Sequence, residues 1–261
     1  MQLSNSTWKQ AQEYFAKRDL VILPVGSLEN HGSHLCLGTD AKVPQYLADQ
    51  LETRLQAAFA PVMPFGCADH HTDFPGTVSI GTDGLYLVMS RVVQCLYQAG
   101  GRHFVFLNGH GGNDPALSQV GLEMSQKGAL CCILDWWVLA GKLNEQWAGG
   151  HGAGEETAAM LAIDPSCVHM EYFQDPHPQD LSPELPYGRG VEVLCNGIGV
   201  PVPRKVATYA SAGWYGPDHP TKATCQWGQE MLQATVDFCV DFIEKFERVP
   251  LKSATTAAQI L

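Results

Sequence analysis

Four short apolar runs alternate with longer segments of helical periodicity, and this alternation most limits the folds open to the chain. The apolar runs cover residues 19–26, 60–65, 103–107 and 129–134. Each is almost continuously hydrophobic, which is typical of a strand covered on both faces by helices. The helical segments cover residues 42–58, 84–98, 114–127 and 227–246. This order predicts an α/β fold with right-handed crossovers: a doubly wound, mainly parallel sheet flanked by helices.

The chain is expected to form a single domain over residues 1–261. Its length of 261 residues fits one large α/β domain, and no Pro/Gly/Ser-rich tract divides it into parts of different composition. A hydrophobic fraction of 45% supports one sizeable core and excludes a disordered chain. Residues 175–220 carry Pro and Gly throughout and are expected to form a long irregular excursion. Such loops in compact domains tend to be functional.

The charge balance argues against nucleic acid and membranes as partners. The chain has 27 acidic and 16 basic residues, a formal charge of −11, and no basic run. The resulting negative field repels phosphate backbones and anionic lipids. No continuous apolar stretch is long enough to span a bilayer, and the first residues lack the features of a signal peptide. Nine scattered cysteines without a Cys-x-x-Cys spacing indicate reduced thiols, and we expect a cytoplasmic protein.

Polar side chains that can bind metal follow three of the apolar runs. Glu29, His31 and Asp40 follow the first run, His110 follows the third, and Glu156 lies some way after the fourth. In an open α/β sheet, ligands bind outside the carboxyl ends of the strands. A mixed carboxylate and imidazole set suits Zn, Mn or Fe(II) better than it suits soft metals. The alternation of Glu29 and His31 puts both side chains on one side of an extended segment.

An aspartate such as Asp40 can bridge two cations about 3.5 to 4 Å apart, the arrangement found in two-metal hydrolysis. Each signal also has an ordinary structural explanation. A Gly-rich turn with one His, as around His110, is a common strand-to-helix turn, and a Glu at a helix start such as Glu156 is favoured by the helix dipole. The joint occurrence of these residues at strand ends and helix starts favours a metal site.

At these positions the sequence resembles the creatininase (creatinine amidohydrolase) family. The matching motifs occur in order at residues 23–34, 74–79, 107–113 and 151–157. The resemblance implies a creatininase-like α/β/α fold, usually assembled into a homohexamer, with two divalent metal ions per chain (Zn, Mn or Fe). The expected partners are a small-molecule substrate and other copies of the chain.

The resemblance also implies individual site residues. Glu29, Asp40 and His110 look like the ligands of one metal, and His31 with the bridging Asp40 like those of the second. Creatinine-cleaving members take a further carboxylate from a position that is Gly112 here. Glu156 is the expected replacement for that ligand.

The substrate pocket departs from that of creatinine-cleaving members, so creatinine itself is not the expected substrate. Gly150 precedes His151, where those members have a Glu. Trp137 is the candidate for the family Trp that stacks on a flat substrate. We expect His71 and Gly111 to contact the substrate as well.

The expected reaction is hydrolysis of a C–N bond in a small cyclic amide or formamide by a metal-bridging hydroxide. His151 would protonate the leaving group, and Glu155 would orient His151 or shuttle the proton. His151 has a structural alternative as a helix cap in a Gly-rich loop. Two other functions stay open: a hydrolase or lyase that opens a polyhydroxylated or oxidised carbocycle, and a non-catalytic oligomeric descendant of the fold.

Overall fold

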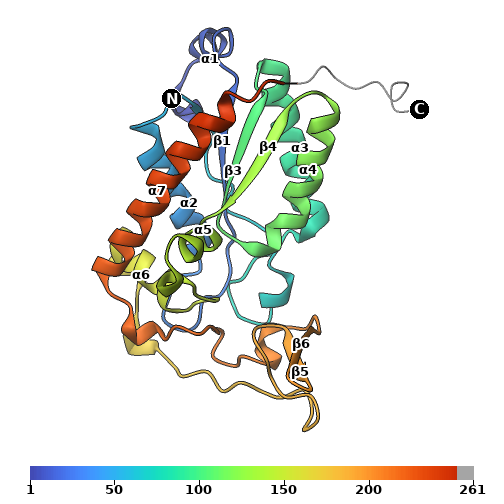
Figure 1. The fold of residues 1–261 in the computed structure, drawn as a ribbon, viewed down its shortest axis with the longest axis vertical. Helices are drawn as coiled ribbons and strands as arrows, with labels where there is room; N and C mark the ends of the chain where they lie inside the picture. Colours follow the sequence, from blue (N-terminus) through green and yellow to red (C-terminus); the bar gives the residue numbers. More distant parts are fainter. Residues whose placement is uncertain (252–261) are drawn as a thin grey trace, which may run out of the picture.

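The computed structural model describes residues 1–251 and contains a four-stranded parallel sheet in the order β2-β1-β3-β4. The strands are β1 (Leu20–Val25), β2 (Ala58–Phe59), β3 (His103–Asn108) and β4 (Leu130–Asp135). β1 pairs with β3 along its whole length, and β3 pairs in the same way with β4. The parallel sheet predicted from the sequence is confirmed (Figure 1).

Helices cover both faces of this sheet. The helices are α1 (Trp8–Phe15), α2 (Thr39–Glu52), α3 (Gly81–Ala99), α4 (Asp114–Gln126), α5 (Trp136–Leu143), α6 (Gly154–Ile163) and α7 (Cys225–Glu247). Residues of α2, α5, α6 and α7 share one apolar core with the sheet, and residues of α3 and α4 share a second core. Figure 1 shows these two helical layers on either side of the strands.

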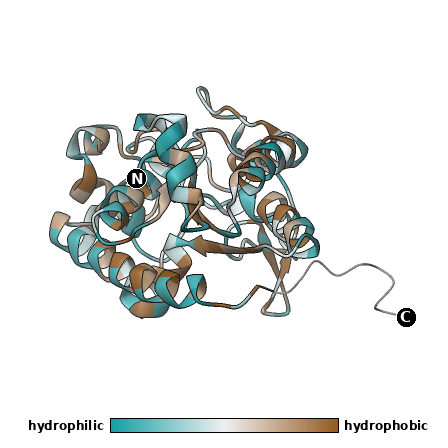
Figure 2. Cartoon of the chain, turned by 90° about the horizontal axis from the view of Figure 1, so that it is seen from above, coloured by the Kyte–Doolittle hydropathy of each residue, from teal (hydrophilic) through white to brown (hydrophobic). Residues whose placement is uncertain are grey.

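The alternation along β1 explains why both faces are covered. Leu20 and Ile22 belong to the core with α2 and α7, while Val21, Leu23 and Val25 belong to the core with α3 and α4. All five are at most 2% exposed. Successive side chains of a strand point to opposite faces, so a continuously apolar strand needs a cover on each side. Seen from above, the strands are brown and the outer faces of the helices are largely teal (Figure 2).

The strand predicted over residues 60–65 is wrong. The chain pairs with β1 at Ala58–Phe59, and beyond that only Met63 forms an isolated bridge with Val25. Pro61 and Pro64 flank this bridge, and proline has no N–H to donate to a sheet.

The helix predicted over residues 42–58 is also displaced, because α2 runs from Thr39 to Glu52. Its apolar continuation, including Leu55 and Ala57, is buried in the turn that leads into β2. The earlier start matters for the site because it puts Asp40 in the first turn of the helix. The other three predicted helices are confirmed with small shifts at their ends, whereas α1 and α5 were not predicted.

The excursion over residues 175–220 carries an antiparallel hairpin, β5 (Glu192–Cys195) and β6 (Ile198–Pro201), near the bottom of Figure 1. Asn196 and Gly197, with φ of 50° and 79°, make its two-residue turn. Short 3-10 helices occur at Leu3–Asn5, Asp69–His71, Gly111–Asn113, Glu145–Trp147, Pro165–Cys167, Met170–Tyr172, Val206–Thr208 and Pro220–Lys222. Within residues 1–251, every helix is too short or too polar to traverse a bilayer.

Candidate metal centre

The structure brings together all five residues that the sequence suggested as metal ligands. Their ligand atoms form two groups, Glu29–Asp40–His110 and His31–Asp40–Glu156, and within each group the atoms lie within 4.8 Å of one another. Asp40 belongs to both groups, as a bridging carboxylate would. All five side chains are buried, and none of these residues is more than 7% exposed.

His110 faces two carboxylates with one nitrogen and the backbone with the other. Its Nε2 lies 2.9 Å from the carbonyl oxygen of Cys67, which can only accept, so the hydrogen is assigned to Nε2. Its Nδ1 lies 3.1 Å from Glu29 Oε1 and 3.2 Å from Asp40 Oδ2. Both of these oxygens are buried and have no hydrogen-bond partner. Either a proton or a metal ion has to lie between Nδ1 and the two oxygens.

His31 repeats this arrangement in the second group. Its Nδ1 lies 3.1 Å from the carbonyl oxygen of Glu29, while its Nε2 lies 2.8 Å from Asp40 Oδ1 and 3.7 Å from Glu156 Oε2. Metal-binding histidines typically donate their other N–H to a carbonyl or carboxylate in this way. Two imidazoles are therefore oriented from the backbone toward one shared carboxylate.

The pKa values of the metal-free chain show how strongly these groups need a cation. Burial lowers the pKa of His31, yet Asp40 and Glu156 outweigh burial and raise it to about 10. Burial also raises the pKa of Glu29, and it raises that of Glu156 to about 7. For Asp40, burial is outweighed by His31 and His110, which hold its pKa below its usual range. A divalent cation can replace the protons that the cluster otherwise retains.

By the family resemblance, Gly112 stands where creatinine-cleaving members have a metal-binding carboxylate. The local packing leaves no room for a side chain at this position. A Cβ at Gly112 would lie 2.2 Å from the carbonyl oxygen of Cys67 and 2.4 Å from His110 Nε2. Glu156 instead approaches from the first turn of α6, where the backbone N–H of Gly152 donates to its Oε2 at 2.6 Å. The carboxylate that sequence comparison suggested as a replacement thus lies within reach of His31 and Asp40.

The loop after β3 is shaped to hold Asp40 and His110 together. A Cβ at Gly109 would lie 1.9 Å from the carbonyl oxygen of Asp40, so only glycine allows this approach. Asn113 ties the loop to its neighbours: its Nδ2 donates to the carbonyl of Gly26, and its Oδ1 accepts from the N–H of Cys67. Close packing therefore explains why glycines stand on both sides of His110.

His151 lies beside the cluster and keeps one nitrogen free of hydrogen bonds. Its Nε2 lies 2.7 Å from the carbonyl oxygen of Asn30, and its Nδ1 lies 3.8 Å from Glu29 Oε1. Its backbone exchanges two hydrogen bonds with Tyr215. Burial, followed by the neighbouring His71, lowers the pKa of His151 well below 6.5. The imidazole is therefore neutral, and its Nδ1 lone pair is unused.

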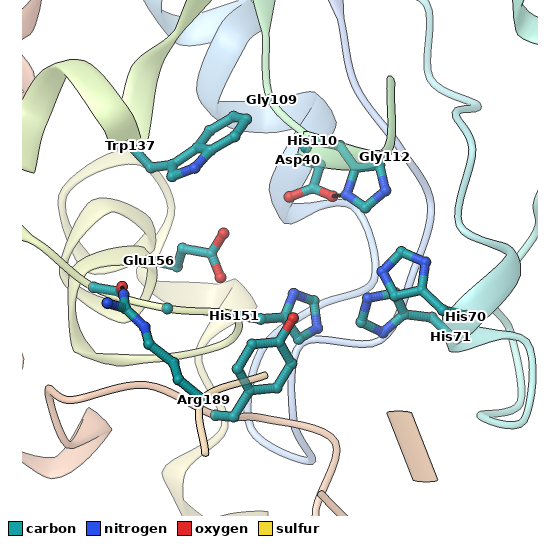
Figure 3. Close-up of a pocket in the computed structure, with 14 residues that line it drawn as sticks. Asp40, His70, His71, Gly109, His110, Gly112, Trp137, His151, Glu156 and Arg189 are labelled. Carbon is teal, nitrogen blue, oxygen red and sulfur yellow. Dashed lines mark hydrogen bonds and ion pairs between the residues drawn. The ribbon is translucent and has the colours of Figure 1, made fainter. Parts of the chain in front are cut away.

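A cavity of about 370 Å³ opens onto this cluster. It is lined by Asp40, His70, His71, Gly109, His110, Gly111, Gly112, Trp137, Gly149, Gly150, His151, Glu156, Arg189 and Tyr215. Figure 3 shows Trp137, Glu156 and Arg189 on one side and His70 and His71 on the other. The three residues expected to contact the substrate, Trp137, His71 and Gly111, are all in the wall.

His71 differs from the other two because it is only 1% exposed. Its Nδ1 accepts from Asn30 Nδ2 at 2.7 Å, so its Nε2–H faces Glu29 Oε1 at 3.4 Å. Its polar contacts are therefore with Asn30 and with the candidate ligand Glu29.

Glu155 is the one predicted site residue that neither lines the cavity nor belongs to a donor group. It is fully buried behind Gly149, whose Cβ would lie 1.7 Å from Glu155 Cδ. Burial, then Glu156 and Asp218, raise its pKa well above the usual value. Among the described residues it makes no hydrogen bond to His151, which Asn30 and Tyr215 hold instead.

Sequence reasoning left open whether His70 and Tyr215 line the pocket, and it did not consider Arg189. Tyr215 and Arg189 come from the Pro- and Gly-rich excursion, whose length and composition were the signal that it serves the site. His70 adjoins His71 on the same 3-10 turn.

Comparisons with known proteins agree with this geometry. The family model for creatininase, described as creatinine amidohydrolase, matches residues 4–243. The mycofactocin precursor peptide peptidase of Mycobacterium tuberculosis (strain H37Rv) is 30% identical over 88% of this chain and 86% of its own. The 3-dehydro-scyllo-inosose hydrolase of Thermotoga maritima is 27% identical over 97% of this chain and 87% of its own.

Solved structures show the same fold. A creatininase described as Zn-Zn type matches with a TM-score of 0.74 and 23% identity, over 95% of this chain and 98% of its own. Another, described as creatininase Mn, has the same TM-score and 22% identity, over 95% and 99%. The family model spans almost the whole chain, so this chain belongs to the creatininase family, whose members are metal-dependent amidohydrolases.

Proposed function

We propose that this protein is a hydrolase that binds two divalent ions and cleaves a C–N bond in a small cyclic amide or formamide. The observation that carries the proposal is the orientation of His31 and His110. Each directs one ring nitrogen at a backbone carbonyl and the other at buried carboxylate oxygens. Metal-binding histidines are typically held in this way, and a cation among the buried oxygens would balance their charge in place of protons.

One ion would be held by Glu29, Asp40 and His110, and the other by His31, Asp40 and Glu156. Zn and Mn suit this donor set, and Fe(II) has the same preference for imidazole and carboxylate. When bound, such a pair supplies an acidified water and polarises a carbonyl.

His151 is the group in this chain best placed to move the proton. It lines the cavity, its Nδ1 lies 3.8 Å from Glu29 Oε1, and its low pKa keeps it neutral before reaction. It accepts the proton of the attacking water at Nδ1 and returns it to the leaving nitrogen. The backbone of Tyr215 and the carbonyl of Asn30 hold the ring in place for both transfers.

The cavity wall orients the substrate. Trp137 is half-buried in the cavity wall, and its Cζ2 would lie 3.5 Å from a Cβ at Gly111, so the indole packs beside this glycine. Its aromatic face suits stacking on a flat amide. We assign to His71 the positioning of Glu29, since its ring nitrogens face Asn30 and Glu29.

The relative from Thermotoga maritima keeps a second candidate open, the hydrolytic opening of an oxidised carbocycle. One experiment separates the candidates. The Zn- or Mn-loaded protein is incubated with ring amides, formamides and cyclic polyhydroxy ketones in water labelled with heavy oxygen. Amide hydrolysis gives a labelled carboxylate and a free amine, whereas opening of a carbocycle gives a labelled carboxylate without amine.

A lyase or isomerase gives a product without a labelled carboxylate. A protein that binds no metal and converts none of these compounds would be the non-catalytic descendant, and the proposed hydrolase would be rejected.

We also infer a homohexamer of single-domain chains in a reducing compartment such as the cytoplasm. Large apolar side chains are left exposed on the single chain: Leu87 is 59% exposed, Leu122 63% and Ile198 69%. Exposed apolar side chains become patches that mark subunit contacts where they adjoin one another, and we propose such contacts for these residues. All nine cysteines are free thiols, which supports the reducing compartment. Light scattering of the purified protein tests the hexamer.

A further inference from the structure

The cavity wall contains one Lys or Arg side chain among the described residues, Arg189. Every other ionisable group in the wall is a carboxylate, a histidine or a tyrosine. Arg189 is therefore the one permanently positive side chain of the wall, in a chain whose formal charge is −11.

The position of Arg189 is held by its own loop. Its Nη2 donates to the carbonyl of Gly149, another residue of the wall, at 2.6 Å. The following residue, Gly190, has φ of 58°, and its N–H donates a hydrogen bond to the hydroxyl oxygen of Tyr187. A Cβ at Gly190 would lie 3.1 Å from the ring of Tyr215. The loop thus packs against the cavity wall and directs Arg189 there.

Arg189 has donors left over for a ligand. Within residues 1–251 its guanidinium makes one hydrogen bond, to Gly149, and no ion pair with a carboxylate. A guanidinium carries five N–H donors in a planar fork that matches a carboxylate. The nearby carboxylates of the wall, Asp40 and Glu156, face His31 instead.

We propose that Arg189 binds a carboxylate of the substrate, so that the enzyme acts on amides bearing an anionic group away from the scissile C–N bond. This assignment rests on the proposed function for the reaction itself. A cavity of about 370 Å³ admits such a compound, since it lies near the lower end of the range for small-molecule sites. A single planar fork suits a carboxylate, whereas phosphate sites usually add a helix N-terminus or further cations.

The test compares ligands that differ only in charge. Malonate, succinate, glutarate and adipate, and the monoamide of each, are titrated calorimetrically into the Zn- or Mn-loaded protein. Each monoamide has a single carboxylate, which can lie at the metal centre or at Arg189 but not at both, whereas a dicarboxylate of matching length can occupy both. For at least one chain length, the dicarboxylate should bind about tenfold more tightly or better, as expected for hydrogen bonds to a charged group.

Arg189→Gln should abolish this preference. Gln removes the charge and the fork but keeps an amide N–H donor on a shorter side chain. Arg189→Lys should retain part of the preference, because it keeps the charge but loses the fork. Arg91→Gln removes the same charge from the exposed surface of α3 and should leave the preference intact.

Two results would overturn the assignment: a wild-type protein with no preference at any chain length, or a preference that survives in Arg189→Gln. The proposed function fails separately. If the preference depends on Arg189 but no amide is hydrolysed, the reaction is wrong and the anion site stands. If amides are hydrolysed but dicarboxylates are not preferred, the proposed reaction stands and the anion site at Arg189 is rejected.

Discussion

Replacing Glu156 with Gln should have opposite effects on the metal-free and the metal-loaded protein. Glu156 is 6% exposed, and burial raises its pKa from 4.5 to about 7. At about 1.4 kcal/mol per pKa unit, this difference of about 2.5 costs the folded metal-free chain about 3 kcal/mol once the carboxylate is ionised. Gln removes that cost and still accepts the hydrogen bond from Gly152.

The sign of the effect depends on pH. Below the unfolded pKa of 4.5 the carboxyl is protonated in both states, so Glu156→Gln should change little. Between pH 4.5 and about 7 the folded chain retains the proton that the unfolded chain loses, and the wild type is progressively destabilised. Above about pH 7 the metal-free variant should be more stable by about 3 kcal/mol, or roughly 5 to 10 °C in Tm.

With metal bound, the wild type should be more stable than Glu156→Gln. The variant loses one of the three donors His31, Asp40 and Glu156, so the second ion should be lost on dialysis while the ion at Glu29, Asp40 and His110 remains. The assays are calorimetric melting with and without Zn at pH 4 to 8, and elemental analysis. Glu155→Gln is the matched control, because Glu155 is equally buried but belongs to neither donor group. It should stabilise the metal-free chain and keep both ions.

The reasoning would be refuted if metal-free Glu156→Gln were less stable than the wild type at pH 8. It would also be refuted if the variant kept two ions per chain.

Three further substitutions test the other assignments. Asp40→Ala should remove both ions, because Asp40 belongs to both donor groups, and an ion retained in elemental analysis would contradict its bridging role. His151→Asn should keep both ions but lower turnover about 10²-fold or more, whereas unchanged turnover would assign His151 to structure alone. Gly112→Glu should lower the Tm without adding a ligand, because its Cβ would lie 2.2 Å from the carbonyl oxygen of Cys67. A third ion or an unchanged Tm in this variant would show that the loop can move aside.

The sequence by itself determined the parallel sheet and the donor residues. Continuous apolar runs such as residues 20–25 need cover on both faces, and hydrophobic periodicity is a local property that can be read along the chain. Parallel strands bring their carboxyl ends to one edge, so Glu29, His31 and His110 could be expected to meet there. The same reasoning misjudged residues 60–65, where two prolines outweigh the apolar pattern.

The tertiary structure alone decided which residues complete the cavity. Arg189 and Tyr215 lie far along the chain from Glu29 and reach the site through an irregular segment without periodicity. Glu155 and Glu156 are neighbours on one helical turn, yet Glu156 reaches His31 while Glu155 lies behind Gly149. Which side of a helix faces a site depends on how the helix packs against the rest of the fold, and a short buried helix such as α6 carries no polar face to reveal it.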